Sequence, residues 1–452
     1  MKVLLSAYAC EPEKGSEPAV GWHWVQQIAR SHDVWVITRT NNREAIEAAL
    51  RENPLPRVRW IYADLPRWAR FWKRGELGIH LYYYLWQFVA YRCALTCHRQ
   101  IHFDVTHHVT FGKYWVPSLL WLLPAPFVFG PVGGGEMTPL PFWWSYSLRG
   151  KVLDAVRYLS QLAGRADPFL RLMASRTALA IAATEQTATR LRRLGVRRVV
   201  VHPQWAMPES EFDRFRSAGQ RNGHAFRVVG MGRLIHWKGF HLTIRAFAEF
   251  HGTHPGSELW IVSDGPERGR LERLARSLGV ADAVTFWGRL PRLSDVYSKL
   301  MESDVLVHPA LHEAFGNVCL EAMAAGKPVI CLDIGGPAVQ VTDATGFRIP
   351  ATRVTQAVQG LAAALSTLAD SPRLREEMGE AAVARVREKF RWDRTGDWMA
   401  AVYMETCNEG QALLESPFAE EMRQRMLEPA RAHIVPAEPD MTRRPESPAR
   451  QH

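Results

Sequence analysis

Cysteine is scarce in this chain, whose 452 residues include six, at positions 10, 93, 97, 319, 331 and 407. None of them stand at the paired spacing of a zinc site, so we expect reduced thiols in a cytoplasmic protein. The chain also lacks any Asp-x-Asp sequence. Paired carboxylates are typical ligands for a divalent cation on a diphosphate, so we expect neither a metal nor another cofactor.

Long uninterrupted apolar runs are also missing. Residues 114–135 carry no charge, but they contain Pro117, Pro124, Pro126 and Pro131. Prolines in such number interrupt a spanning helix, so we predict a short helix and then a buried strand at 126–130, and no transmembrane segment. The opening MKVLLSAYAC is too short an apolar run for a signal peptide, and we expect none.

Acidic residues are fewer than basic ones, 46 against 56, which gives a net charge of +10 and a pI near 9.5. The arginines are spread along the chain and form no basic low-complexity tail. This balance suits a diphosphate substrate or an anionic membrane surface, and we expect no nucleic acid as a partner. With 452 residues, the chain is long enough for two domains, and its 47% hydrophobic residues are sufficient to form their cores.

Short apolar runs alternate with helical patterns from the first residue onward, which predicts α/β architecture with parallel sheets. Runs at 2–7, 34–38 and 58–62 are the first three expected strands. We expect a Rossmann-like domain at 1–205, an irregular polar linker at 206–223 and a second Rossmann-like domain at 224–390. C-terminal helices follow at 391–428, the first crossing back to the first domain, and residues 429–452 have the composition of a disordered tail.

The stretch from Asp304 to Gly336 carries the strongest chemical signal. It contains a strand, a loop, a helix and a second strand, so its loop lies at the carboxyl edge of a parallel sheet, where such sheets bind ligands. Gly316 and Asn317 stand where the helix begins, and free N–H groups there attract phosphate. Glu321 points back toward the same loop and can accept hydrogen bonds from a ribose diol, while Glu313 offers a second carboxylate.

The string HEAFGNVCLEAMAAGKPVI, with its Glu-x7-Glu spacing, resembles the signature of retaining glycosyltransferases of family GT4, which have the GT-B fold. The resemblance implies two doubly wound parallel-sheet domains that face a central cleft. It places Glu313, a catalytic residue, on the hydroxyls of the donor sugar and Glu321 on the ribose. Phe315, Gly316 and Asn317 complete this donor-binding loop.

Further strings carry the same resemblance. In GRLIHWKG, the family pattern implies that Arg233 and Lys238 stabilise the charge that develops on the departing β-phosphate. It implies that the backbone around Gly288 and Arg289 holds the base. The first loop of such enzymes closes over the diphosphate, a role that falls here to the single Gly15, beside a predicted helix cap at Ser16 or Glu17.

Two histidines end the strand predicted at 104–108, and successive strand residues face opposite sides, so only one can face the cleft. The resemblance implies a histidine against the transferred sugar, and we assign His107 in preference to His108. A histidine satisfied by local backbone bonds is the alternative. After the next strand, Gly134, Gly135 and Glu136 belong to a glycine loop that we place on the acceptor side.

Residues 67–99 combine nine large aromatic residues with several Arg and Lys and one Glu. One interpretation is a helical pair whose aromatics fill the first domain's core. The other is a basic, aromatic surface that rests on a membrane interface.

Together these features predict an enzyme, a retaining, metal-independent hexosyltransferase. Its donor is a UDP- or GDP-hexose and its acceptor a glycan or a lipid-linked sugar in exopolysaccharide or lipopolysaccharide biosynthesis. We expect it in the cytoplasm, as a peripheral protein at the inner face of the membrane. The alternatives are a nucleotide-sugar epimerase of the same fold and a basic non-enzymatic binding module, which leaves the glutamate pair unexplained.

Overall fold

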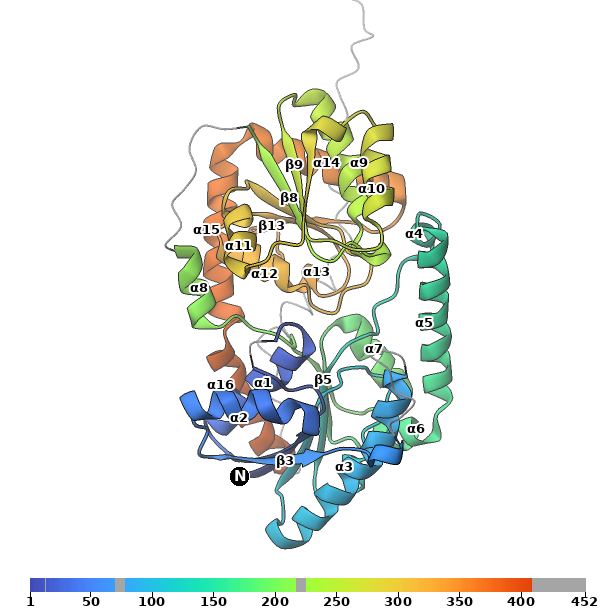
Figure 1. Cartoon of the computed structure of the whole chain (residues 1–452), viewed down its shortest axis with the longest axis vertical. Helices are drawn as coiled ribbons and strands as arrows, with labels where there is room; N and C mark the ends of the chain where they lie inside the picture. Colours follow the sequence, from blue (N-terminus) through green and yellow to red (C-terminus); the bar gives the residue numbers. More distant parts are fainter. Residues whose placement is uncertain (13, 70–77, 217–224, 409–452) are drawn as a thin grey trace, which may run out of the picture.

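Two parallel β-sheets, each flanked by helices, form the computed structural model, which describes residues 1–12, 14–69, 78–216 and 225–408 (Figure 1). The first sheet has seven strands in the order β3-β2-β1-β4-β5-β6-β7, and the second has six in the order β10-β9-β8-β11-β12-β13. Every strand pair within them is parallel. The predicted α/β class with two Rossmann-like domains is confirmed.

Strands of the first sheet are almost continuously apolar because helices cover both of its faces. In β1 all residues after Lys2 are buried. The strands are β1 (Lys2–Ala7), β2 (Asp33–Arg39), β3 (Val58–Ala63), β4 (Val105–Thr110), β5 (Phe127–Val132), β6 (Leu179–Ala182) and β7 (Val199–Val201). The helices are α1 (Glu17–Ala29), α2 (Arg43–Glu52), α3 (Ile79–Ile101), α4 (Leu140–Trp143), α5 (Leu148–Ala166), α6 (Pro168–Arg176) and α7 (Glu185–Leu194).

The second sheet repeats this design. Its strands are β8 (Arg227–Met231), β9 (Glu258–Val262), β10 (Val284–Gly288), β11 (Val305–His308), β12 (Val329–Leu332) and β13 (Gly346–Ile349). Its helices are α9 (Phe240–Thr253), α10 (Arg268–Ser277), α11 (Leu293–Met301), α12 (Asn317–Ala324), α13 (Pro337–Gln340), α14 (Val354–Asp370) and α15 (Pro372–Lys389).

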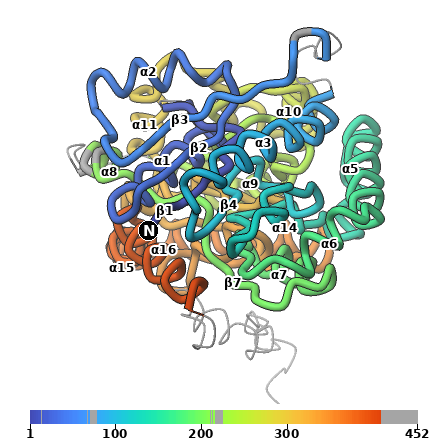
Figure 2. Tube along the Cα trace, turned by 90° about the horizontal axis from the view of Figure 1, so that it is seen from below, coloured from blue at the N-terminus to red at the C-terminus, as the bar shows by residue number. Residues whose placement is uncertain are grey.

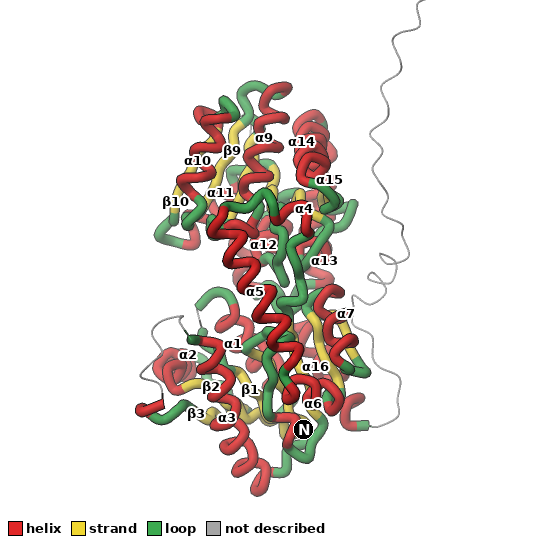
Figure 3. Tube along the Cα trace, turned by 90° about the vertical axis from the view of Figure 1, so that its right-hand side faces the viewer, coloured by secondary structure: helices red, strands yellow, loops and turns green. Residues whose placement is uncertain are grey.

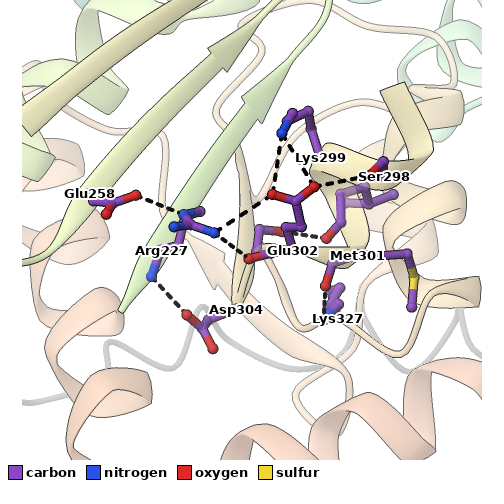
Figure 4. Close-up of polar contacts among 10 residues, drawn as sticks. Arg227, Glu258, Ser298, Lys299, Met301, Glu302, Asp304 and Lys327 are labelled. Atoms are coloured by element: carbon purple, nitrogen blue, oxygen red, sulfur yellow. Dashed lines mark hydrogen bonds and ion pairs between the residues drawn. The ribbon is translucent and has the colours of Figure 1, made fainter. Parts of the chain in front are cut away.

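Arg227 joins the amino ends of three strands of this second sheet (Figure 4). Its side chain donates to Glu258 at 2.8 Å and to the Glu302 carbonyl at 3.1 Å, and its backbone N–H donates to Asp304 at 2.7 Å. The guanidinium also lies 3.6 Å from the centre of the Trp260 ring. A buried arginine is stable here because carboxylates and a carbonyl satisfy it. The network anchors the end of the sheet opposite to the ligand-binding edge.

The two domains exchange elements. The last described helix, α16 (Trp392–Cys407), packs on α1 of the first domain, where Tyr403 is fully buried (Figures 1 and 2). In the other direction, α4 and the start of α5 reach the second domain (Figure 3). Phe142 and Tyr146 belong to the second domain's core, and Ser147 donates to Glu267 at 2.7 Å.

The linker expected at 206–223 to be irregular contains a helix, α8 (Glu209–Arg216). The segment is mostly polar, which led to the prediction of an irregular linker. It nevertheless contains two apolar residues at positions i and i+3, Phe212 and Phe215, whose burial stabilises the helix. Residues 217–223 lie outside the described part of the chain, as do the tail predicted at 429–452 and any helix after residue 408. All six cysteines are free. Within the described ranges, no helix combines the length and apolarity that a membrane crossing needs.

The aromatic segment at 67–99 is divided between core and surface. Tyr82, Tyr83 and Trp86 of α3 are buried, and Tyr83 and Trp86 pack edge-on against Tyr8. The core interpretation is therefore correct for these rings. Phe88 and Trp68 remain exposed on the surface. Phe71, Trp72 and the basic residues at 70, 73 and 74 lie outside the described residues.

Candidate active site

A cleft of about 1030 Å³ lies between the carboxyl edges of the two sheets. The first domain lines it with residues from six segments: Ser16, Glu17, Val20, His80, Gly112, Lys113, Trp115, Gly133, Gly134, Glu136, Leu153, Val156, Arg157, Ser160 and Gln204. The second domain contributes Met231, Gly232, Trp237, Lys238, Val262, Ser263, Arg289, Leu290, Val296, His312, Glu313, Ala314, Phe315, Gly316, Asn317, Val318 and Glu321. Its size and position suit a ligand that contacts both domains.

The loop before α12 forms one wall of the cleft. Gly316 precedes the helix with φ +85°, in the left-handed region that glycine adopts without strain, and Asn317 begins the helix. No side chain caps this helix start. The first N–H groups of α12 therefore remain available to an anion at the cleft surface.

Glu321 lies one turn into α12 and lines the same wall. Burial, together with the smaller effect of the nearby Glu211 of α8, raises the pKa of its carboxyl group to about 7. Burial likewise raises the pKa of Glu211. Water solvates a buried carboxylate poorly, so a ligand that donates hydrogen bonds to Glu321 stabilises its charged form.

Glu313 and Lys238 form an ion pair inside the cleft. Lys238 ends a short 3₁₀ turn, and the following Gly239 has φ +75°. A Cβ at Gly239 would lie 2.0 Å from the Pro309 carbonyl oxygen, so only glycine permits the turn to pack against this loop. The pair places a cation and a carboxylate next to the uncapped helix start.

The facing wall of the cleft carries a second pair of oppositely charged residues, Glu17 and Lys113, which the sequence did not indicate as cleft residues. Glu17 accepts a hydrogen bond from the Gly112 N–H, and burial raises the pKa of its carboxyl group. Lys113 contacts His80 with Nζ and Nε2 3.1 Å apart. Burial lowers the pKa of Lys113 to about 8, while Glu17 opposes this shift. Burial and the Lys113 charge lower the pKa of His80 to about 4.

The glycine loop after β5 is organised around Glu136. The Glu136 carboxylate accepts from the Gly134 N–H at 2.7 Å and from the hydroxyls of Thr184 and Thr187. Gly134 and Glu136 line the cleft, whereas Gly135 does not, and its N–H donates to the Thr187 hydroxyl at 3.0 Å. The carboxylate of Glu136 therefore holds the loop in shape.

The structure does not place His107 at the cleft. The ring is fully buried, with Nδ1 bonded to the Tyr403 hydroxyl and Nε2 to the Gly130 carbonyl. Burial lowers the pKa of His107 to about 3, so it is neutral. His108 is also buried, beside the Tyr83 hydroxyl at 3.3 Å. Helix α16 covers the face of β4 that His107 occupies, and this contact between distant segments could not be deduced from the strand alone.

Three other expected donor residues lie outside the cleft lining. Arg233 is exposed, and Gly15 is an exposed loop residue with no atom within 4 Å of a Cβ position. The carbonyl of Gly288 accepts from the Ser263 N–H at 2.8 Å, while Arg289 lines the cleft. At the first loop, Ser16 makes no side-chain cap bond, since its φ of 65° turns it away from the helix start, and Glu17 bonds across to Gly112.

Sequence reasoning missed Glu17 and Lys113 as cleft residues, although each follows the carboxyl end of a strand. Arg157 and His312 were also missed. Arg157 comes from α5, and burial lowers its pKa. His312 stacks on Trp237 with ring centres 4.8 Å apart and lies 3.6 Å from Asp154. The position of α5 across the cleft depends on tertiary packing, so the sequence offered no signal for Arg157.

Residues 211–385 match the family described as glycosyl transferases group 1. The chain is 36% identical over 211 residues to the lipopolysaccharide core biosynthesis glycosyltransferase LpsD of Rhizobium meliloti, covering 46% of this chain and 58% of the relative. It is 34% identical over 191 residues to glycogen synthase of Mycobacterium tuberculosis, covering 42% and 45%. The chain thus spans about half the length of these curated relatives.

The whole fold has a solved counterpart. Anabaena HepE in complex with UDP superimposes with a TM-score of 0.58 at 19% identity, over 89% of this chain and 99% of that one. At this identity the likeness concerns the fold alone. The chain has the GT-B fold, and the region that matches glycosyl transferases group 1 begins in α8 and extends through the second domain into α15.

Proposed function

We propose that this protein is a retaining glycosyltransferase that moves a hexose from a nucleotide-sugar donor to a glycan or lipid-linked sugar. One observation carries the proposal: Glu321, the uncapped start of α12 and the Glu313–Lys238 pair follow one another along one wall of the cleft. They match a ribose diol, a diphosphate and a hexose in that order. The UDP bound to Anabaena HepE supports a nucleotide donor.

The charges in the cleft support departure of the nucleotide without a bridging metal. Lys238 supplies a fixed cation, and the N–H groups of α12 supply a second positive site for the leaving diphosphate. No cluster of three metal-ligating side chains occurs within the described part of the chain. We expect full activity after EDTA treatment. Loss of turnover in EDTA that magnesium restores would contradict this step.

The anomeric configuration of the sugar can be retained in two ways. Either an enzyme carboxylate attacks the sugar first, or the nucleotide departs and the acceptor attacks on the same face of the sugar. Two carboxylates of the first domain line the cleft, and both are engaged: Glu136 by Gly134 and two threonines, and Glu17 by Gly112. This arrangement favours same-face attack, with the leaving phosphate accepting the acceptor's proton and Glu313 oriented on the donor hydroxyls.

A thermal-shift panel of UDP-, GDP- and ADP-hexoses identifies the donor, since a bound ligand raises the melting temperature by mass action. Proton NMR of the product of the stabilising donor then reads the anomeric configuration. Sugar transferred with inverted configuration would contradict retention. An epimer of the donor, formed without acceptor, would instead identify an epimerase.

The acceptor we propose is a surface glycan or a lipid-linked sugar at the inner face of the membrane. Support comes from LpsD, whose name places it in lipopolysaccharide core biosynthesis. The protein's net charge of +10 is consistent with an anionic surface.

A further inference from the structure

Helix α5 carries an apolar stripe that nothing in the described structure covers. Five of its residues recur at intervals of three or four and therefore share one helix face. They are Leu148, Val152, Val156, Leu159 and Leu162, with exposed fractions of 80, 56, 54, 61 and 40%. A row of this length is unusual on the surface of a soluble monomer.

The stripe continues beyond α5 at both ends. Leu140 and Trp144 stand before it, 80 and 71% exposed, and Phe169 and Leu172 of α6 follow, 42 and 45% exposed. Figure 2 shows α5 at the rim of the molecule, and Figures 1 and 3 show it running alongside both domains. Exposed apolar residues are therefore present from α4 through α5 to α6.

The charges around this surface are one-sided. Residues 140–176 contain two Asp and six Arg or Lys, of which Arg157 lies in the cleft and the other five do not. Neither acid belongs to the stripe. Asp154 faces His312 across the cleft at 3.6 Å, and Asp167 accepts from the Phe169 N–H at the start of α6.

At the end of α5, four arginines line a pocket of about 400 Å³: Arg165, Arg171, Arg190 and Arg193. None of them forms an ion pair with an acid among the described residues. Arg165 donates to the Tyr114 hydroxyl, and Arg171 donates to the Arg165 carbonyl, so their positions are fixed. Several guanidinium groups around one cavity suit a phosphate group.

We propose that α5 and α6 dock on an anionic lipid bilayer, with the apolar stripe in the interface and the four-arginine pocket on a lipid phosphate. Apolar insertion combined with basic residues is the physical basis of reversible interfacial binding. Val156 belongs both to the stripe and to the cleft lining, so docking holds the cleft mouth at the bilayer surface. The docking surface does not depend on the proposed transfer reaction.

The test is sedimentation of the full-length protein with vesicles of phosphatidylcholine alone or with roughly 30% phosphatidylglycerol, which gives the vesicle a negative surface potential. Binding is expected only to the anionic vesicles, and it should decrease as salt rises. Leu148→Gln with Leu159→Gln should lower the partition constant about tenfold or more. Arg171, Arg190 and Arg193 changed together to Gln should lower it roughly 100-fold.

Matched controls change exposed residues of the same kinds elsewhere. Leu293→Gln with Met404→Gln removes two apolar residues, 49 and 59% exposed, outside the stripe. Arg43, Arg292 and Arg373, changed to Gln, remove the same charge from surface positions. Both controls should bind vesicles within about twofold of the wild type.

Two outcomes would overturn the proposal: a protein that stays in the supernatant with anionic vesicles, or controls that lose binding as much as the test variants. A dimer in light scattering that the Leu148 and Leu159 changes dissociate would show that a second copy covers the stripe. Thermal unfolding verifies that each variant is folded. Vesicle binding is read without donor or acceptor, so failure of the proposed reaction leaves this result unaffected.

Discussion

Glu321 connects the chemistry of the cleft to pH at the scale of single residues. Its pKa of about 7 comes from burial and from Glu211. Only the carboxylate form accepts both hydrogen bonds of a ribose diol, so below pH 7 a proton must leave before the donor binds. The affinity for a UDP-hexose should therefore fall as pH decreases, approaching tenfold per unit well below pH 7.

Calorimetry between pH 5.5 and 8 measures this dependence, and a nucleotide sugar is the right ligand because its diphosphate diester keeps its charge in this range. Glu321→Gln should bind roughly 10- to 100-fold more weakly at pH 8 and show a flat pH profile. A wild-type profile as flat as that of the glutamine variant would rule out Glu321 as the diol acceptor.

Lys238 and Arg233 were predicted together as cations for the leaving phosphate, but the structure separates them. Lys238 lines the cleft beside Glu313, whereas Arg233 is exposed outside the lining. Lys238→Gln should lower kcat by about 10²–10³, the typical loss for one fixed transition-state donor. Arg233→Gln should remain within about threefold of the wild type. Steady-state rates of sugar transfer compare kcat in the two variants. Equal losses in both would show that Arg233 enters the cleft when the donor binds.

At the scale of elements, α4 is a first-domain helix whose Phe142 is buried in the second domain's core. Phe142→Ala leaves a cavity there and should reduce the free energy of unfolding by about 3–5 kcal/mol. Leu140→Ala, two residues earlier and 80% exposed, is the control and should change it by less than about 0.5 kcal/mol. Urea unfolding followed by circular dichroism measures both. Similar values in the two variants would show that α4 does not contribute to the second core.

Part of this architecture and of the cleft could be predicted from the sequence. Alternating apolar runs sufficed for both sheets, and the Asp304–Gly336 stretch placed Glu313, Gly316, Asn317 and Glu321 on one wall of the cleft. These predictions rest on local order along the chain. The burial of His107 by α16 and the arrival of Arg157 from α5 depend on contacts between distant segments, which periodicity does not encode.

At the scale of the whole molecule, the two domains approach each other at Gly133 and Ala314. A Cβ built on Gly133 would lie 2.8 Å from the Ala314 Cβ, closer than two side chains can stand. Gly133 does not have a positive φ, so alanine there is strained only by this contact. Gly133→Ala should therefore hold the domains slightly apart and lower the transfer rate about tenfold, because the cleft acts on the donor from both walls.

Ala314→Gly, added to Gly133→Ala, removes the opposing methyl group and should restore most of the lost rate. The coupling expected from this cycle is roughly 1 kcal/mol. Affinity for free UDP should stay within about twofold in all three variants, because the proposed nucleotide contacts belong to the second domain. If the double variant is as slow as Gly133→Ala, the loss arises within the glycine loop, through its contacts with Ala183 and Glu136, and the approach of the two domains at this point does not limit the reaction.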